Sequence, residues 1–228
     1  YYQNCPPVPG YRPHDKELNK RGFEWQGLKV FSNNLVYHYG QPIALVVADT
    51  WEKAVKAAKL VKAEYFTEPF ETDFEKLRKY ESKLKKISEY KRGETDAYKN
   101  ADVFVEAEFS TPIETHNPME MHATIAIWEG DDKLTVYDKS QGPKGTQSQL
   151  ARCFGLDEKN VRVITEFVGG AFGASLRSWP NVPAAVIAAK KVKRPVKVLL
   201  NRRQMFSMVG YRPQAWQKIA IGANKDGK

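Results

Sequence analysis

The stretch from Val161 to Arg177 constrains this chain more than any other, because an apolar strand pattern runs directly into a cluster of glycines. The cluster, Gly169 to Gly173, reads GGAFG, and glycines this close together let a backbone approach a ligand that side chains would hold off. A phosphate-binding loop would carry Lys and then Ser or Thr after its glycines, and neither stands in register here. A G-x-G-x-x-G dinucleotide fingerprint fails as well. The turn therefore predicts a ligand other than a simple nucleotide.

The composition is that of a globular protein, with 42% hydrophobic and 28% charged residues among 228. No run of about 18 apolar residues is present, so we expect no membrane span. The net charge of +9 favours an anionic partner in principle. Much of the excess lies in Lys-rich segments such as residues 76–86, where Glu and Lys interleave as on a solvated helix face. Charge alone therefore assigns no nucleic-acid function.

The two ends of the sequence lead us to expect a fragment of a longer polypeptide. The chain starts without Met and without a signal-peptide pattern, and it finishes in a polar turn with no strand after it. Its two cysteines, Cys5 and Cys153, are too few for a disulfide framework, and no C-x-x-C is present to hold zinc or an iron–sulfur cluster. This usage fits a reducing compartment.

The hydrophobic patterns predict an α+β fold in two parts joined by a polar linker at 67–100, which includes a charged helix at 74–90. The first part has short strands at 28–31, 35–37, 43–48 and 63–66, and a helix at 51–62 capped by Thr50. The second part starts near Ala101. Its predicted strands are 103–109, 123–128, 134–138, 161–167, 196–200 and 216–221, and its predicted helices are 146–154, ending at Gly155, and 183–191.

Three further clusters of residues carry chemistry. The segment 115–122 has two histidines around a glutamate, but Pro118 and a six-residue spacing keep them off one helix face, so a buried turn is favoured over zinc. Gln141 follows a predicted strand and precedes a helix, where α/β proteins place ligand-facing groups, and its amide is a donor. The basic residues at 190–195 and 202–203 lack interleaved aromatics, so a solvated loop is favoured over a nucleic-acid site.

In their order along the chain, these segments resemble the large, molybdenum-binding subunit of the xanthine dehydrogenase/aldehyde oxidase family, and most of all its aldehyde oxidoreductase-type branch. The segments that carry the resemblance are 40–65, 114–143, 161–173, 194–206 and 210–213. The resemblance implies the C-terminal part of an α/β hammerhead domain at 1–66, a linker at 67–100, and the N-terminal half of a molybdenum-cofactor-binding domain at 101–228.

The resemblance also implies a binding site for a molybdenum–pterin cofactor, in the form of molybdopterin or its cytosine dinucleotide. Gln141 matches the glutamine whose amide contacts an oxygen ligand of molybdenum. Phe172 matches the phenylalanine whose backbone N–H faces the ligands of the metal, while Gly170, Ala171 and Gly173 allow close approach. No residue here is expected to bind the metal directly. The general-base glutamate of the family is expected beyond Lys228, so the fragment alone should be inactive.

The implied reaction is oxidation of aldehydes, or of related carbonyl or heterocyclic substrates, with water as the oxygen source. Electrons would pass to an iron–sulfur subunit and an FAD subunit. Ser175 and Leu176 stand where purine-oxidising members carry Lys and a substrate-binding Glu, which favours an apolar carbonyl substrate over a purine. We expect a cytoplasmic location, or the periplasm if a partner subunit carries an export signal. The oligomeric state stays open.

Two alternatives come from other functional classes. One is a non-catalytic module that binds anions or nucleic acid, based on the net charge, and it predicts salt-dependent affinity for nucleic acid. The other is a structural subunit of the same complex with a decayed site. The presence of both Gln141 and Phe172 disfavours the structural alternative.

Overall fold

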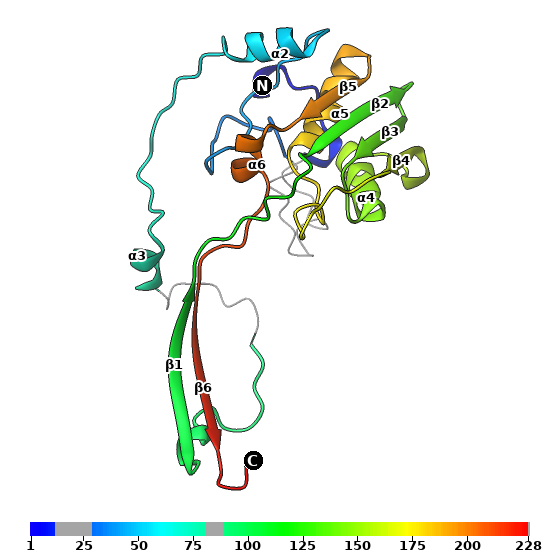
Figure 1. The fold of residues 1–228 in the computed structure, drawn as a ribbon. Helices are drawn as coiled ribbons and strands as arrows, with labels where there is room; N and C mark the ends of the chain where they lie inside the picture. The colour runs from blue at the N-terminus through cyan, green and yellow to red at the C-terminus, as the bar shows by residue number, and fades with distance from the viewer. Residues whose placement is uncertain (12–28, 81–88, 228) are drawn as a thin grey trace. The chain divides into compact units, whose positions relative to one another are not determined.

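The computed structural model describes residues 1–11, 29–80 and 89–227. Within these ranges the chain forms two compact units (Figure 1). Unit 1 contains residues 1–62 and 115–211, and unit 2 contains residues 63–114 and 212–228. Each unit has its own sheet.

Unit 1 is built on a four-stranded sheet with the order β4-β3-β2-β5. Its strands are β2 (Ala123–Glu129), β3 (Lys133–Asp138), β4 (Val161–Ile164) and β5 (Val196–Leu199). The predicted hairpin is confirmed, because β2 and β3 pair in antiparallel fashion around a turn in which Gly130 has a φ of 68°. β3 and β4 are parallel and are connected by helix α4 (Pro143–Phe154), which forms a strand–helix–strand unit.

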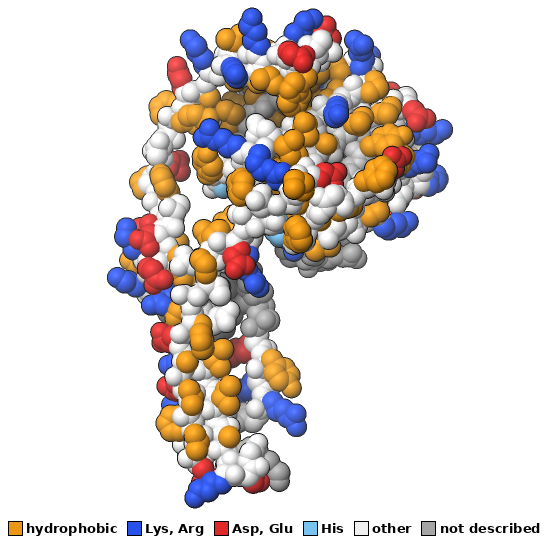
Figure 2. All heavy atoms as spheres, viewed as in Figure 1, with side chains coloured by type: hydrophobic (Ala, Val, Ile, Leu, Met, Phe, Trp, Pro, Cys, Tyr) orange, Lys and Arg blue, Asp and Glu red, His pale blue; other side chains and the backbone are white. Residues whose placement is uncertain are grey.

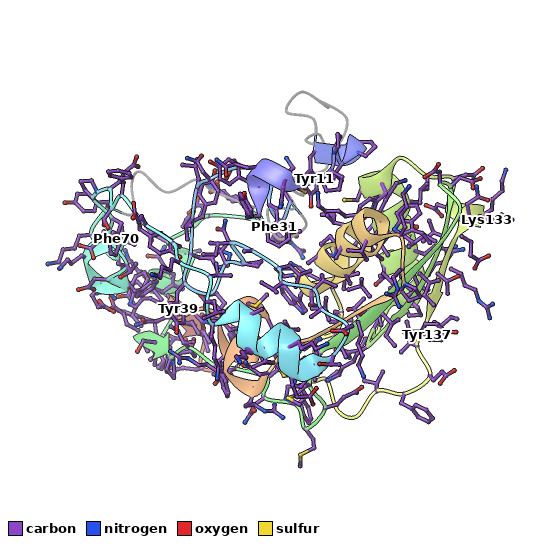
Figure 3. The ribbon with its side chains drawn as sticks, turned by 90° about the horizontal axis from the view of Figure 1, so that it is seen from above. Tyr11, Phe31, Tyr39, Phe70, Lys133 and Tyr137 are labelled. Atoms are coloured by element: carbon purple, nitrogen blue, oxygen red, sulfur yellow. The ribbon has the colours of Figure 1, made fainter. Side chains whose placement is uncertain are left out.

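The core of unit 1 lies between one face of this sheet and the helices α4 and α5 (Asn181–Val192). Ala126 on β2 and Val136 on β3 point into it, and every residue of α5 from Asn181 to Ala189 is buried. Helix α4 ends as predicted, with Gly155 in the left-handed conformation at a φ of 67°. Lys133 and Tyr137, near the two ends of β3, are exposed instead (Figure 3).

The N-terminal residues cover this core without adding strands to it. Phe31 is buried in the core and Tyr11 packs against it (Figure 3 labels both). The strands expected at 35–37, 43–48 and 63–66, and in the described part of 28–31, are wrong, since these residues adopt turns or irregular backbone. A strand needs a neighbour to take up its backbone groups, and no described strand pairs with them.

The described ranges hold three further α-helices, along with short 3₁₀ turns at Tyr2–Asn4, Pro9–Tyr11, Ala97–Asn100 and Glu158–Asn160. α2 (Trp51–Ala58) is capped as predicted by the Thr50 side chain, which accepts the N–H of Lys53 at 3.3 Å. α3 (Phe74–Arg78) occupies the start of the predicted charged helix, and residues 81–88 of that prediction lie outside the described ranges. α6 (Arg202–Met208) was not predicted.

Unit 2 is a two-stranded antiparallel ribbon of β1 (Val103–Thr111) and β6 (Ala215–Ala223) (Figure 1). Both strands extend the predicted ranges slightly. Hydrophobic side chains gather along the ribbon (Figure 2). Phe104 and Ile221 are among the exposed ones. The guanidinium of Arg78 in α3 lies over the ring of Trp216 at 4.9 Å. Across the parts of the chain that are described, no helix has the length and apolarity needed to cross a membrane.

Candidate functional site

The parallel pairing of β3 and β4 brings Gln141 and the glycine turn together. Tyr137 pairs with Ile164 near the carboxyl ends of the two strands, and loops that follow parallel neighbours leave the sheet at the same edge. The loops then contact one another directly. The backbone N–H of Gln141 donates to the carbonyl oxygen of Ser175 at 2.8 Å, and the N–H of Ser175 donates to Oε1 of Gln141 at 3.2 Å.

These contacts orient the side chain of Gln141. Because Oε1 already accepts from Ser175, the Nε2 amide is the group that this exposed side chain has left to donate. Three buried hydroxyl groups also form hydrogen bonds beside this loop. Ser140 Oγ lies 3.2 Å from Thr146 Oγ1 and accepts the N–H of Gly142 at 3.0 Å, and Ser178 also bonds to Thr146.

The glycine turn has a backbone that few residues tolerate. The φ angles of Gly170, Phe172 and Gly173 are 81°, 55° and 97°, and a positive φ is uncommon for any residue with a side chain. Phe172 is 75% exposed, so burial of its ring does not explain the conformation. Turns of this kind form concave backbone sites that suit anions and other groups rich in oxygen.

The turn packs closely against the 115–122 segment. A Cβ on Gly169 would lie 2.9 Å from Cβ of Glu120, and a Cβ on Gly173 would lie 3.4 Å from Nε2 of His116. His116 is itself placed by a hydrogen bond between Nδ1 and the carbonyl oxygen of Gly210 at 3.1 Å. Gly169 is therefore needed for close approach to this segment, whereas Gly173 is needed for its φ of 97°.

The expected buried turn at 115–122 is only partly right, because Pro118 and His122 are buried while Met119 is 86% exposed. Its residues are fixed by backbone contacts, and Lys139 Nζ donates to the carbonyl oxygen of Glu120 at 2.7 Å. His122 is only 2% exposed, and burial, with the nearby charge of Lys139, lowers its pKa from 6.5 to about 4. Among the described residues, no group of three His, Cys, Asp or Glu side chains is placed to hold a metal ion.

Several members of the basic cluster bind other parts of the chain. Arg202 donates to the carbonyl oxygens of Pro118 and Met119 at 2.6 and 2.7 Å. Lys190 Nζ lies over the ring of Trp128 at 4.2 Å and donates to the carbonyl of Asp131. These contacts give the cluster a structural role, which weakens the nucleic-acid alternative.

Sequence reasoning missed the parts played by Glu120, Lys139 and Arg202. Their contacts join residues up to 84 apart in sequence, and no spacing rule connects them. The sequence does contain one chemical signal for the part played by Lys139. A lysine directly after a buried strand, as Lys139 follows Asp138, needs an acceptor inside the fold.

The sheet, the two loops at its carboxyl edge and the parallel strand–helix–strand unit all lie within a cofactor-binding domain of a known family. The sequence profile of the molybdopterin cofactor-binding domain matches residues 79–228, and that of the aldehyde oxidase and xanthine dehydrogenase a/b hammerhead domain matches residues 13–69. The chain belongs to the aldehyde oxidase and xanthine dehydrogenase family and carries part of its molybdopterin-binding region. The predicted family and the α+β fold class, with part of a hammerhead domain before the cofactor-binding domain, are confirmed.

Individual relatives agree with this assignment. The chain is 36% identical over 195 residues to the aldehyde oxidoreductase molybdenum-binding subunit PaoC of Escherichia coli strain K12, which covers 85% of this chain and 26% of that protein. It is 33% identical over 214 residues to abscisic-aldehyde oxidase of Arabidopsis thaliana, a match that covers 87% of this chain and 16% of that protein. Quinoline 2-oxidoreductase of Pseudomonas putida shares the fold, with a TM-score of 0.68 at 22% identity, covering 78% of this chain and 24% of that one. The chain thus spans between 16% and 26% of the length of these relatives.

Proposed function

We propose that this chain is part of the molybdenum-binding subunit of an enzyme that oxidises aldehydes, or related carbonyl or heterocyclic compounds, with oxygen taken from water. The observation that carries the proposal is the pair of hydrogen bonds that joins Gln141 to Ser175, two residues after the glycine turn, beyond the carboxyl ends of β3 and β4. Relatives named as aldehyde oxidoreductase and aldehyde oxidase support the substrate class.

The residues at this edge fit a molybdenum–pterin group, either molybdopterin or its cytosine dinucleotide form. When bound, the group supplies the centre that accepts two electrons from the substrate. Gln141 would donate from Nε2 to an oxygen of the group, and Phe172 would donate from its backbone N–H. Gly170, Ala171 and Gly173 leave room for close approach. Donors that are fixed in advance stabilise negative charge without reorganisation, which is where this site would gain its rate.

The substrate side of the site would be apolar. Leu176 is 62% exposed, and its Cδ1 lies 3.9 Å from where a Cβ on Gly173 would stand. Ser175 is 1% exposed, so its hydroxyl does not face a substrate. Leu176 offers no charge or hydrogen bond to a purine, which favours an aldehyde. Turnover of purines by the intact enzyme would contradict this assignment.

We propose the domain boundaries 1–66, 67–100 and 101–228 for the partial hammerhead domain, the linker and the first half of the cofactor domain. The profile match at 13–69 supports the boundary at 66, and the match at 79–228 starts within the proposed linker. Iron–sulfur and FAD subunits are the proposed partners, nucleic acid is not one, and the cytoplasm is the proposed location. The name of PaoC as a molybdenum-binding subunit supports a multi-subunit enzyme.

The test is molybdenum content and aldehyde oxidation by the full-length protein expressed with its partner subunits. We expect about one molybdenum per large chain by mass spectrometry. Gln141→Ala should lower kcat by roughly 100-fold, the usual cost of losing one such donor. Gln217→Ala, at an exposed glutamine on β6, is the matched control. A protein without molybdenum, from a host that fills a known molybdenum enzyme, would contradict the proposal.

A further inference from the structure

Glu120 and Gly169 are joined by two hydrogen bonds. The backbone N–H of Glu120 donates to the carbonyl oxygen of Gly169 at 3.0 Å. In return, the N–H of Gly169 donates to the Oε2 carboxylate oxygen of Glu120 at 2.5 Å. A pair of bonds between the same two residues fixes both the position and the direction of the peptide that enters the glycine turn. A charged acceptor also makes the second bond stronger than a neutral one.

Glu120 is itself held in place by a second residue. Lys139 Nζ donates to the carbonyl oxygen of Glu120 at 2.7 Å and lies 3.8 Å from Oε2. The Lys139 side chain is only 2% exposed, so its contacts are fixed by the surrounding fold. Burial lowers the pKa of Lys139, while the carboxylate of Glu120 favours its charged form.

These contacts join the ends of two parallel strands. Lys139 directly follows β3, which also leads to Gln141, and Gly169 follows β4 (Figure 1). Through Glu120, the two ligand-facing loops share one set of hydrogen bonds. The segment before Glu120 is fixed as well, by Arg202.

The same geometry argues against Glu120 as a general base. Oε2 already accepts the N–H of Gly169 and lies 3.8 Å from Nζ of the buried Lys139, so this oxygen is engaged within the fold and is not open to a substrate. The role left to Glu120 is that of a fixed hydrogen-bond acceptor for the N–H of Gly169.

We propose that Glu120 is a positioning residue, which clamps Gly169 and thereby fixes the turn that presents the N–H of Phe172. The clamp stands on the geometry above, whereas its consequence for a cofactor rests on the proposed function.

The experiment compares Glu120→Ala and Glu120→Gln in the full-length protein with its partner subunits, with Glu129→Ala at the exposed end of β2 as control. Hydrogen exchange of peptides covering residues 165–177 reports on the turn without a cofactor. We expect Glu120→Ala to speed exchange about tenfold and Glu120→Gln to stay within about threefold of the wild type, because its amide oxygen still accepts from Gly169. We expect kcat to fall in Glu120→Ala at an unchanged KM, and Glu120→Gln to restore it.

The outcomes separate the clamp from the function. Unchanged exchange in Glu120→Ala overturns the proposal, and so does faster exchange with unaltered kcat and molybdenum content. If Glu120→Ala does not fold, Glu120→Gln decides: near wild-type exchange and kcat support an acceptor role, and loss of activity overturns it. If the wild type binds no molybdenum, the proposed function fails, and the exchange comparison alone decides whether Glu120 clamps the turn.

Discussion

Arg202 donates from its guanidinium group to the carbonyl oxygen of Pro118 across 2.6 Å, and this bond ties the start of α6 to the segment beside the glycine turn. A second nitrogen donates to the carbonyl oxygen of Met119 at 2.7 Å, and the side chain of Asn117 accepts at 3.2 Å. A planar fork with several fixed donors suits such a set of acceptors, and an ammonium group does not match it. Arg202 therefore orders this segment as no lysine would.

Arg202→Ala should lower the free energy of unfolding by about 2 to 3 kcal/mol, since it leaves carbonyl acceptors without a charged donor. Arg202→Lys should recover only part of the loss. Urea or thermal unfolding of the purified protein measures both. Arg203→Ala is the control, because Arg203 is the exposed neighbour on the same turn of helix. Equal effects at the two positions would show that the contacts to Pro118 and Met119 contribute nothing.

Two glycine substitutions should shift stability in opposite directions. Gly173 has a φ of 97°, so Gly173→Ala should cost roughly 1 to 2 kcal/mol through backbone strain alone. Gly145 lies inside α4, and a Cβ there would meet nothing within 4 Å. Gly145→Ala should therefore stabilise the protein by about 1 kcal/mol through helix propensity. Thermal unfolding of the two variants measures both effects. Stabilisation by Gly173→Ala would contradict the claim that the turn requires a glycine at this position.

The sequence predicted most of unit 1 because its hydrophobic alternation and capping residues agree with the fold. The hairpin of β2 and β3, the end of α4 at Gly155 and the Thr50 cap all follow from local chemistry. The strand expected at 43–48 failed because an apolar run says nothing about whether a partner strand is present. The seven-residue helix α6 was missed, although the Asn201 and Gln204 capping box is a local signal that could have found it.

The candidate site residues could be predicted only where they directly follow a predicted strand. Gln141 and the glycine turn each follow a predicted strand, and the resemblance to a known family picked them out. Whether they bind the cofactor stays a prediction. The clamp between Glu120 and Gly169 connects residues 49 apart in sequence, and it depends on how β3 and β4 pair. No periodicity carries that information.

His122 should make the protein less stable in mild acid. Its pKa is about 4 in the fold and near 6.5 when unfolded, so the unfolded chain binds more protons between these values. The contribution of His122 is therefore complete above pH 6.5 and is lost as the pH falls towards 4, by about 3 kcal/mol in all. The measurement is unfolding free energy against pH for the wild type and His122→Leu, which cannot titrate. Parallel curves for the two proteins between pH 4 and 6.5 would contradict a buried neutral histidine.

Asp138 should change the pH dependence of stability in the opposite direction to His122, over an overlapping pH range. It accepts a hydrogen bond from Thr124 at 2.7 Å, and Thr124 in turn accepts from Asn181 at 2.8 Å, all within the core. Burial raises the pKa of Asp138 from 3.8 to about 7, despite these hydrogen bonds. The folded protein therefore binds the extra proton, and stability falls as the pH rises from about 4 to 7.

Asp138→Asn removes this titration and keeps an oxygen that can accept from Thr124. The stability of the wild type relative to Asp138→Asn should therefore drop by about 4 kcal/mol between pH 4 and pH 7, and stay level above pH 8. Between pH 4 and 6.5 the two opposite slopes largely cancel in the wild type, so each single variant should show a steeper profile than the wild type or the double variant Asp138→Asn/His122→Leu. A wild-type advantage that grows with pH would mean that Asp138 is ionised in the fold and stabilised by its neighbours, contrary to its burial.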